Sequence, residues 1–143
     1  MRLLFLLFMF INIFHAAYIR DINSDTILDT NKLIMWQDDS DAKTITKTWI
    51  DAINYCDTLT LAGFSDWRLA NINELISVLS IETPNIAIES IFSNISDSGY
   101  KYWSSTTFTN DTTNAWSIYF KTGKIQTNLK TENNYLRCIR DFN

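Results

Sequence analysis

Apolar and polar positions alternate after residue 17 in a pattern that predicts a β-hairpin. Ile27-Leu28 and Leu33–Trp36 lie on either side of Asp29–Lys32, a turn-prone tetrapeptide. Three carboxylates follow this hairpin, at Asp38, Asp39 and Asp41. Because no glycine and no distal glutamate complete a calcium-binding loop, these carboxylates favour a solvated acidic turn over a calcium site.

The apolar period lengthens in the middle of the chain and predicts two helices. Residues 46–62 place one apolar stripe on a helix: Trp49, Ala52, Ile53, Cys56 and Leu59. We expect Gly63 to cap the C-terminus of this helix. A second helix is expected to begin near Asn71, since Asn71 and Glu74 have the spacing of a capping box. Its buried face consists of Leu75, Val78 and Leu79.

Strands are expected again after Pro84, the only proline, which ends any helix and opens an irregular stretch to about Gly99. Trp103 and Ser105 then face one way, and Tyr102, Ser104 and Thr106 face the other. In the next strand Trp116, Ile118 and Phe120 alternate with Ser117 and Tyr119. Further strands are predicted at Lys124–Leu129, after a Thr122-Gly123 turn, and at Tyr135–Arg140.

The N-terminus has the pattern of a secretory signal peptide. Arg2 is the basic n-region, residues 3–14 are almost entirely apolar, and His15-Ala16-Ala17 supplies small residues for cleavage. An apolar run of about 12 residues is too short to span roughly 30 Å of hydrocarbon, which needs about 20. We therefore expect cleavage after Ala17, with an uncleaved tether as the alternative. Residues 18–143 would then form one secreted or periplasmic domain.

The composition excludes several classes of function. The chain has 12 Lys and Arg against 16 Asp and Glu, a net charge of −4. This balance argues against nucleic acids and anionic membrane surfaces as partners, because both are bound mainly by clustered basic residues. The single histidine, His15, leaves with the signal peptide. Without imidazole, Ser-His-Asp catalysis, Cys-His catalysis and histidine-ligated zinc are excluded, and we expect no metal and no cofactor.

The chain contains two cysteines, Cys56 and Cys138. Outside the cytoplasm such a pair favours a structural disulfide. Closing a loop of about 80 residues stabilises by roughly 4–5 kcal/mol in the chain-entropy model. The alternative is a reactive or metal-binding thiol pair, but the wide separation rules out a local Cys-x-x-Cys redox site.

In their order along the chain, short motifs from Asp29 to Arg140 resemble the Lcl C-terminal domain family, named after the Legionella collagen-like adhesin. The motifs are Asp29 with Leu33-Ile34-Met35-Trp36-Gln37; Trp49, Ala52 and Cys56; Asp66-Trp67-Arg68-Leu69 with Glu74-Leu75; Tyr102-Trp103-Ser104-Ser105-Thr106; Ala115-Trp116; Phe120 with Gly123; and Arg137-Cys138-Ile139-Arg140. One departure is Ala70, because the family usually has proline after the Arg-Leu pair. This departure affects the rigidity of the turn into the second helix.

The resemblance implies an α+β, C-type-lectin-like fold with two helices and a small antiparallel sheet. It also implies that a disulfide joins the first helix to the last strand. The calcium ligands of sugar-binding C-type lectins are absent, because Pro84 lies in Thr83-Pro84-Asn85 and Trp116 is followed by Ser117-Ile118. Calcium-dependent sugar binding by that route is therefore not expected.

Most of the distinctive side chains are expected to stabilise the fold. Tryptophans on apolar faces favour core packing over stacking on a sugar, and these are Trp36, Trp49, Trp103 and Trp116. Arg68 lies six residues before Glu74 and favours a structural ion pair or a brace for the loop. Ser104-Ser105-Thr106 has no assignable base, which favours sheet hydroxyls over a nucleophile. The full structural set is Trp36, Trp67, Arg68, Glu74, Trp103 and Trp116.

The candidate ligand-binding residues lie on Thr106–Asn114, the longest polar segment between strands. They are Asn110, Asp111 and Asn114. Loops of this kind commonly carry the binding surface of a rigid scaffold, although a purely solvated loop is the alternative. Asn94-Ile95-Ser96 and Asn110-Asp111-Thr112 match glycosylation sequons, which arise often by chance in a chain rich in Asn and Thr.

Three functions from different classes follow from these features. The leading hypothesis is a non-enzymatic extracytoplasmic adhesion module that binds a glycan or a surface protein. The second is an envelope accessory protein that binds another exported protein through an apolar patch. The third is an oxidase related to the formylglycine-generating group, which would need two reactive thiols; Cys56 and Cys138 occupy the structural positions instead.

Overall fold

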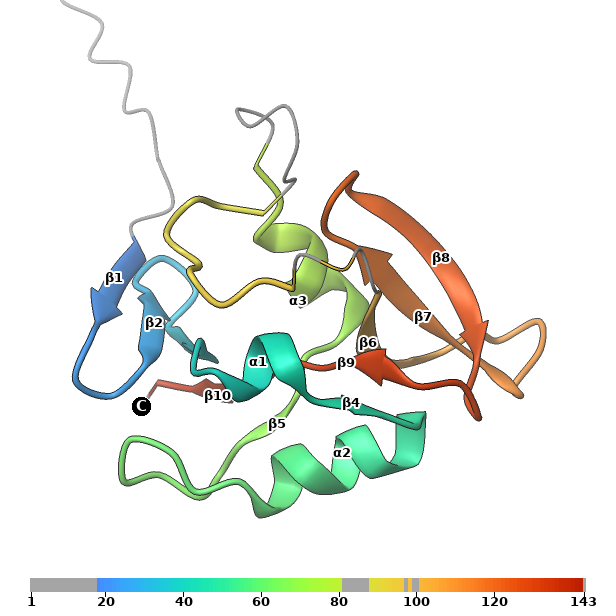
Figure 1. Ribbon diagram of the computed structural model, residues 1–143, viewed down its shortest axis with the longest axis horizontal. Helices are drawn as coiled ribbons and strands as arrows, with labels where there is room; N and C mark the ends of the chain where they lie inside the picture. The colour runs from blue at the N-terminus through green and yellow to red at the C-terminus, as the bar shows by residue number, and fades with distance from the viewer. Residues whose placement is uncertain (1–17, 81–87, 97, 99–100, 143) are drawn as a thin grey trace, which may run out of the picture.

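The computed structural model describes residues 18–80, 88–96, 98 and 101–142. The expected signal peptide, the helix end at Pro84 and Gly99 lie outside these described residues. Within them the chain folds into two five-stranded sheets and three short helices, and Figure 1 shows the β1–β2 hairpin and strand β8 at opposite ends of the molecule. The fold is therefore α+β, but strands predominate.

The first sheet brings the two ends of the domain together. It has the order β1-β2-β3-β10-β5, and every pair in it is antiparallel. Its strands are β1 (Tyr18–Asp21), β2 (Thr26–Asp29), β3 (Ile34–Gln37), β10 (Cys138–Asp141) and β5 (Arg68–Leu69). The register of β2 and β3 pairs Asp29 with Ile34, so the hairpin predicted from the sequence is confirmed.

The second sheet has the order β4-β9-β6-β7-β8. Its strands are β4 (Thr46–Lys47), β9 (Asn134–Tyr135), β6 (Tyr102–Thr107), β7 (Asn114–Tyr119) and β8 (Lys124–Leu129). All pairs are antiparallel except β6 with β9, where Tyr102 lies beside Tyr135. The register of β6 and β7 shifts between Trp103 and Thr107, so the simple two-residue alternation predicted for β6 is interrupted there.

The helices differ from the prediction in number and length. They are α1 (Asp41–Thr44), α2 (Trp49–Thr58) and α3 (Ile72–Ser77). The helix expected over residues 46–62 is shorter in the structure and consists of α2. Thr48 is its N-cap and Leu59 is its C-cap. Gly63 does not cap α2; its φ of 79° serves the turn between Leu61 and Phe64, which exchange two backbone hydrogen bonds. None of these helices is long and apolar enough to cross a membrane.

The capping box predicted at the start of α3 is confirmed. The Asn71 side chain accepts a hydrogen bond from the Glu74 backbone N–H, and the Glu74 carboxylate accepts one from the Asn71 N–H. Arg68 donates two hydrogen bonds to the same carboxylate, at 2.9 and 2.8 Å. Glu74 therefore joins β5 to the first turn of α3, which orients that helix against the sheet.

The strand predicted over Tyr135–Arg140 is in fact two strands in different sheets. Tyr135 ends β9, Cys138 begins β10, and the two residues between them belong to neither sheet. Leu136 and Arg137 are nonetheless buried, at 1% and 0% exposure. At this break the chain crosses from the second sheet to the first, and the Arg137 guanidinium bonds to the Gln37 carbonyl, the Asp38 carboxylate and the Asn94 carbonyl.

The core consists of two clusters on opposite faces of the first sheet, because neighbouring strand residues point to opposite sides. Trp36 belongs to one cluster, which also contains Leu75, Tyr102, Ile118 and Ile139. Met35 belongs to the other, which contains Ala52, Cys56, Trp67, Trp103 and Cys138. Alternating burial of apolar side chains is therefore what holds both sheets and the helices together.

The Cys56–Cys138 disulfide is present, with a Cα–Cα distance of 5.4 Å. It joins α2 to β10, the last strand, inside the second of the two core clusters. Because α1 precedes it, the bonded helix is the second one rather than the first. The bond closes a loop with a sequence separation of 82 residues.

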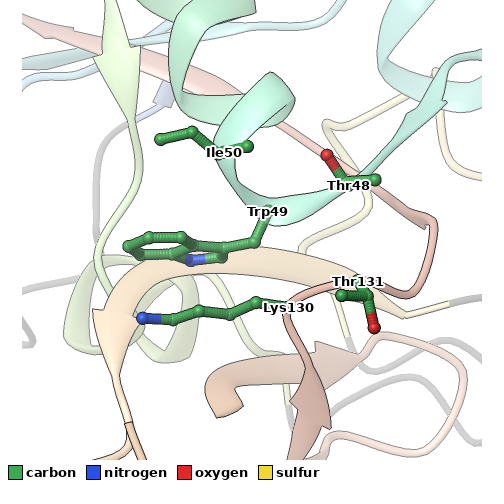
Figure 2. Close-up of a pocket in the computed structure, with 5 residues that line it drawn as sticks. All are labelled: Thr48, Trp49, Ile50, Lys130 and Thr131. Atoms are coloured by element: carbon green, nitrogen blue, oxygen red, sulfur yellow. The ribbon is translucent and has the colours of Figure 1, made fainter. Parts of the chain in front are cut away.

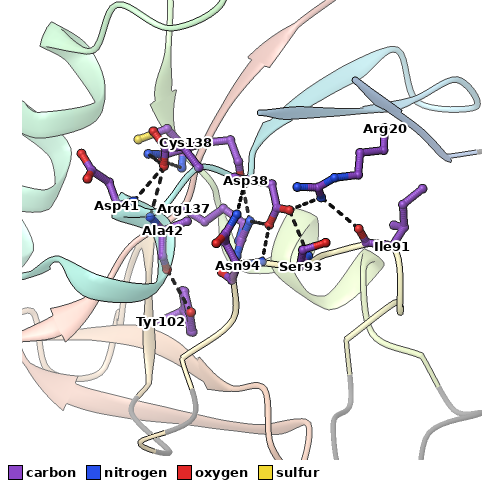
Figure 3. A network of polar contacts seen from close by, with 12 residues as sticks. Arg20, Asp38, Asp41, Ala42, Ile91, Ser93, Asn94, Tyr102, Arg137 and Cys138 are labelled. Carbon is purple, nitrogen blue, oxygen red and sulfur yellow. Dashed lines mark hydrogen bonds and ion pairs between the residues drawn. The ribbon is translucent and has the colours of Figure 1, made fainter. Parts of the chain in front are cut away.

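The sequence favoured a solvated acidic turn after β3. The structure shows that part of this turn is buried. Asp38 is 0% exposed and forms ion pairs with Arg20 and with Arg137, whose Nη1 lies 2.8 Å from the Asp38 Oδ1. The backbone N–H groups of Ser93 and Asn94 donate to the same carboxylate. Figure 3 shows this carboxylate between the two guanidinium groups. A buried charge needs such partners, so Asp38 connects β1, the 88–96 segment and the β9–β10 junction.

The other two aspartates of this turn organise α1. Asp39 accepts hydrogen bonds from the backbone N–H groups of Asp41 and Ala42, and Asp41 accepts one from the Tyr55 hydroxyl at 2.7 Å. Burial raises the pKa of Asp39, although the Gln37 amide hydrogen bond acts in the opposite direction. Within the described residues no group of three His, Cys, Asp or Glu side chains could hold a metal ion.

Candidate binding surface

The polar loop between β6 and β7 is shorter and more ordered than the sequence suggested. Phe108 N–H donates to the Asn114 carbonyl, Asp111 N–H to Phe108 and Asn114 N–H to Asp111, at 3.0, 3.3 and 3.0 Å. Because these backbone hydrogen bonds close two successive tight turns, the loop has a defined conformation before any ligand is present.

Asp111 is the centre of this loop. Its Oδ1 accepts hydrogen bonds from the Thr113 hydroxyl at 2.6 Å and from the Thr113 N–H at 3.1 Å, while its Oδ2 accepts one from the Asn114 amide at 2.8 Å. These bonds favour the charged form, and the Thr113 hydroxyl contributes most to lowering the pKa of Asp111. The structure therefore brings Asp111 and Asn114 into contact, with exposed Asn110 beside them.

A groove of about 410 Å³ lies next to this loop. Its lining comes from the start of α2 and from the residues just after β8: Thr48, Trp49, Ile50, Lys130 and Thr131. Figure 2 shows the Lys130 side chain running along the indole of Trp49, and its Nζ lies 3.9 Å from the ring centroid. This distance is in the range of a cation–π interaction. Ile50 is 55% exposed at the edge of the groove.

The indole and the backbone of Trp49 each donate a hydrogen bond to a carbonyl outside α2. Its Nε1 donates to the Ser104 carbonyl at 2.8 Å, and its backbone N–H donates to the Lys130 carbonyl at 3.0 Å. The second bond satisfies one of the N–H groups that have no partner within α2. The aromatic wall of the groove is thus preformed.

Lys130 connects the groove to the polar loop. Its backbone N–H donates to the Thr113 carbonyl at 2.9 Å, and its ammonium donates to the Thr107 hydroxyl at 2.9 Å. Together with the contacts to Trp49, these bonds make the groove and the loop one continuous surface. We call this surface the Trp49–Asp111 surface; it consists of the five groove residues and residues 107–114.

The tryptophans do not all have the role expected from their apolar positions. Trp36 and Trp103 are 0% exposed and Trp67 is 3% exposed, so these three are core residues. Trp116 is half-buried, belongs to neither core cluster and packs edge-on against Phe108, at 5.3 Å between ring centroids. Trp49 is also half-buried: it packs against the second core cluster, as expected, and its ring lines the groove as well. No local signal distinguishes Trp49, because its ring is paired with a lysine 81 positions further along the chain.

The hydroxyls of Ser104 and Thr106 connect elements of the sheet. Ser104 donates to the Trp116 carbonyl at 2.7 Å, and Thr106 accepts from the Ile72 N–H at 3.1 Å. Of the two sequons, the Asn94 amide donates to the Asp38 carbonyl, whereas Asn110 lies on the exposed turn.

The comparison with known families decides the relationship of this chain. The model of the Lcl C-terminal domain matches residues 25–140. The chain belongs to the Lcl C-terminal domain family. No curated protein matches it. Membership of this family indicates an extracellular, adhesion-related module, and the disulfide in this Lcl C-terminal domain is consistent with a protein outside the cytoplasm.

In this Lcl C-terminal domain Ala70 has a function that proline could not supply. Its backbone N–H donates to the Arg137 carbonyl at 3.4 Å, and its own carbonyl accepts from the Ser105 N–H at 2.8 Å. Proline lacks the N–H group, so it would lose the first of these bonds. The turn into α3 is instead stabilised by contacts to the β9–β10 junction and to β6.

Proposed function

We propose that this domain is a non-enzymatic adhesion module that binds a glycan or a surface protein through the Trp49–Asp111 surface. The observation that carries the proposal is the position of Lys130, which contacts the Trp49 ring, Thr107 and the Thr113 carbonyl. An aromatic wall beside ordered polar groups offers an apolar contact area and a set of hydrogen-bonding groups with fixed positions, which is the usual composition of a recognition site.

The scaffold and its location are part of the same proposal. The two sheets, the helices and the α2-to-β10 disulfide support a C-type-lectin-like fold. We infer that residues 1–17 are a signal peptide, removed after Ala17, and that residues 18–143 form a single secreted or periplasmic domain. The proposal of an oxidase has less support, because it needs two thiols and both cysteines belong to the disulfide.

The experiment replaces the loop and the groove separately. One variant exchanges residues 109–113 for a Gly/Ser segment of equal length, and a second carries Trp49→Ala. A third variant carries Lys130→Ala. Its matched control is Lys43→Ala, which removes an exposed lysine on α1. Each protein is first checked by circular dichroism and thermal unfolding, so that a folding defect is recognised.

Binding is then measured on a glycan array and by pull-down from envelope extract with mass spectrometry. We expect roughly tenfold or greater loss for the loop and groove variants, equivalent to about 1.4 kcal/mol, and no loss for Lys43→Ala. Binding that survives both replacements in folded protein would remove the site assignment. Capture of one exported protein with no glycan signal would favour the envelope accessory function instead.

A further inference from the structure

The two sheets have four edge strands, and β8 differs from the other three. The edges of the first sheet are β1 and β5, and those of the second are β4 and β8. β4 and β5 have two residues each, and β1 has four residues that include Arg20 and Asp21. Short length and internal charges are the usual protections of an edge strand against pairing with another chain.

β8 has neither protection. It has six residues, its register with β7 is regular from Tyr119–Lys124 to Asn114–Leu129, and it contains no proline or glycine. Its only charged residue is Lys124, at its first position. In the part of the chain that the structure describes, no strand pairs with its outer edge, and Figure 1 shows that edge at the margin of the molecule. Most of its outer backbone groups are therefore available to an added strand, whereas the Leu129 carbonyl already accepts a hydrogen bond from the Glu132 N–H at 2.9 Å.

The side chains of β8 divide into an apolar face and an amide face. Ile125 and Leu129 are 40% and 49% exposed, and Thr127 lies between them on the same face. The opposite face carries Gln126 and Asn128, whose amides are hydrogen-bonded to each other. Half-buried Trp116 lies opposite Thr127 on β7 and extends the apolar face inward.

We propose that β8 pairs antiparallel with β8 of a second copy of this chain, about a two-fold axis at Thr127. Residues directly opposite in such a pair point to the same face, so this register places Ile125 opposite Leu129 of the second copy. Thr127 then lies opposite its own copy, and Gln126 lies opposite Asn128. Apolar side chains therefore meet on the exposed face, which is self-complementary in this register. On the other face Asn128 is 6% exposed, and its amide is already bonded to Ser117, Gln126 and Glu132 of its own chain.

The same register places Lys124 opposite Lys130 of the second copy. This repulsion is reduced because the Lys130 ammonium is turned back to the Thr107 hydroxyl and the Trp49 ring. In this register only Ile125–Leu129 of each copy pair strand to strand, which is a small interface, so the expected dimer is weak and concentration-dependent. It would present two copies of the Trp49–Asp111 surface at once, and two linked weak sites bind a repeating or clustered ligand much more tightly than one.

The dimer does not depend on the proposed ligand, and its test needs none. Sedimentation equilibrium of the full domain over a wide concentration range should show a reversible monomer–dimer equilibrium. Thr127→Lys and Thr127→Glu should each weaken it by roughly tenfold or more, because each places like charges opposite each other at the axis. An equimolar mixture of the two variants should associate again, since the opposing charges now attract.

The matched control is Ile22→Lys, which adds the same charge far from β8. Ile22 is 76% exposed and lies in the turn between β1 and β2, two strands of the other sheet. It should leave the dimer unchanged. The proposal is overturned by a wild-type domain that stays monomeric throughout, by a dimer that Thr127→Lys leaves intact, or by a mixture of the two charge variants that does not associate.

Discussion

Asp38 and Asp111 occupy similar sequence contexts and opposite structural environments. Each lies in a short polar turn that follows a strand, Asp38 after β3 and Asp111 after β6. Asp38 is 0% exposed and holds two arginines and two backbone N–H groups from distant segments. Asp111 is exposed, and within the described residues its carboxylate accepts hydrogen bonds from Thr113 and Asn114 of its own turn.

The difference shows that the partners of a carboxylate determine how much of the fold depends on it. Asp38 connects parts of the chain that are far apart, so its loss should affect the whole fold. Asp111 shapes one turn, so its loss should affect only that turn and whatever the turn binds. A buried ion pair is costly to break because the remaining partner stays buried and charged, whereas an exposed group is resolvated at once.

The largest effect is expected from removing the Cys56–Cys138 disulfide. Cys138 directly follows Arg137, the buried ion-pair partner of Asp38. Replacing both Cys56 and Cys138 with alanine opens a loop with a separation of 82 residues, which costs roughly 4.5 kcal/mol in the chain-entropy model. Urea unfolding monitored by tryptophan fluorescence measures the free energy of unfolding. A loss of well under 2 kcal/mol would mean that the buried ion pairs maintain the closed topology without the bond.

Asp38→Ala should cost about 3–5 kcal/mol in the same measurement, because Arg137 is 0% exposed and would lose its carboxylate partner. Asp57, an exposed aspartate on α2, provides the control substitution, Asp57→Ala. If Asp38→Ala and the control have the same stability, the buried network does not determine the fold and the contrast with Asp111 fails.

Asp111→Ala should lower the denaturation midpoint only slightly, far less than Asp38→Ala, because the side chain is exposed and its bonds are local. It should loosen the 109–113 turn, which amide hydrogen exchange at the Asn114 N–H would detect. The same variant should weaken binding at the Trp49–Asp111 surface. A global loss of stability equal to that of Asp38→Ala would contradict the local role.

The smallest effect concerns pH and compares Asp111 with Asp39, the neighbour of Asp38. The pKa of Asp111 is lowered by the Thr113 hydroxyl bond, and the pKa of Asp39 is raised by burial, both from an ordinary value of 3.8. The contribution of Asp111 to stability is present above pH 3.8 and is lost as the pH falls through its lower folded pKa. The pH dependence for Asp39 is the reverse. Its contribution to stability is present below pH 3.8 and is lost as the pH rises through its higher folded pKa.

Carboxyl carbon NMR across the acidic range measures both values directly. Asp39 should titrate at a higher pH than Asp111. The reverse order would show that hydrogen bonding to Gln37 and to the α1 backbone outweighs burial at Asp39.

Some features were predictable because their signals are local. The β2–β3 hairpin follows from alternation around a turn tetrapeptide, and the α3 start follows from the three-residue spacing of Asn71 and Glu74. The β7–β8 hairpin follows from the same kind of reasoning, with Gly123 at a φ of 71°, but its turn has four residues, Phe120–Gly123, rather than the expected two, Thr122-Gly123. Each of these predictions depends on residues a few positions apart, which interact in the same way in many folds.

Other features were wrong or missed because their causes are distant in the sequence. The division of the last strand at Arg137 was missed. Arg137 bonds to Asp38, which lies 99 residues away in the sequence, so no local pattern indicates the break. Trp49 lines the groove because Lys130 and Ser104 hold its indole from other elements. The acidic turn is buried at Asp38 only because the 88–96 segment and β1 cover it.

Composition and short-range pattern were enough to identify the family, the cysteine pair, the acidic charge and most of the local elements. Only the tertiary structure decided which polar groups are buried, how the two sheets are ordered, and that the Asp111 loop and the Trp49 groove share one surface. The physical reason is that burial and ion pairing are properties of side chains brought together by folding, and the periodicity of one strand or helix does not specify its neighbour.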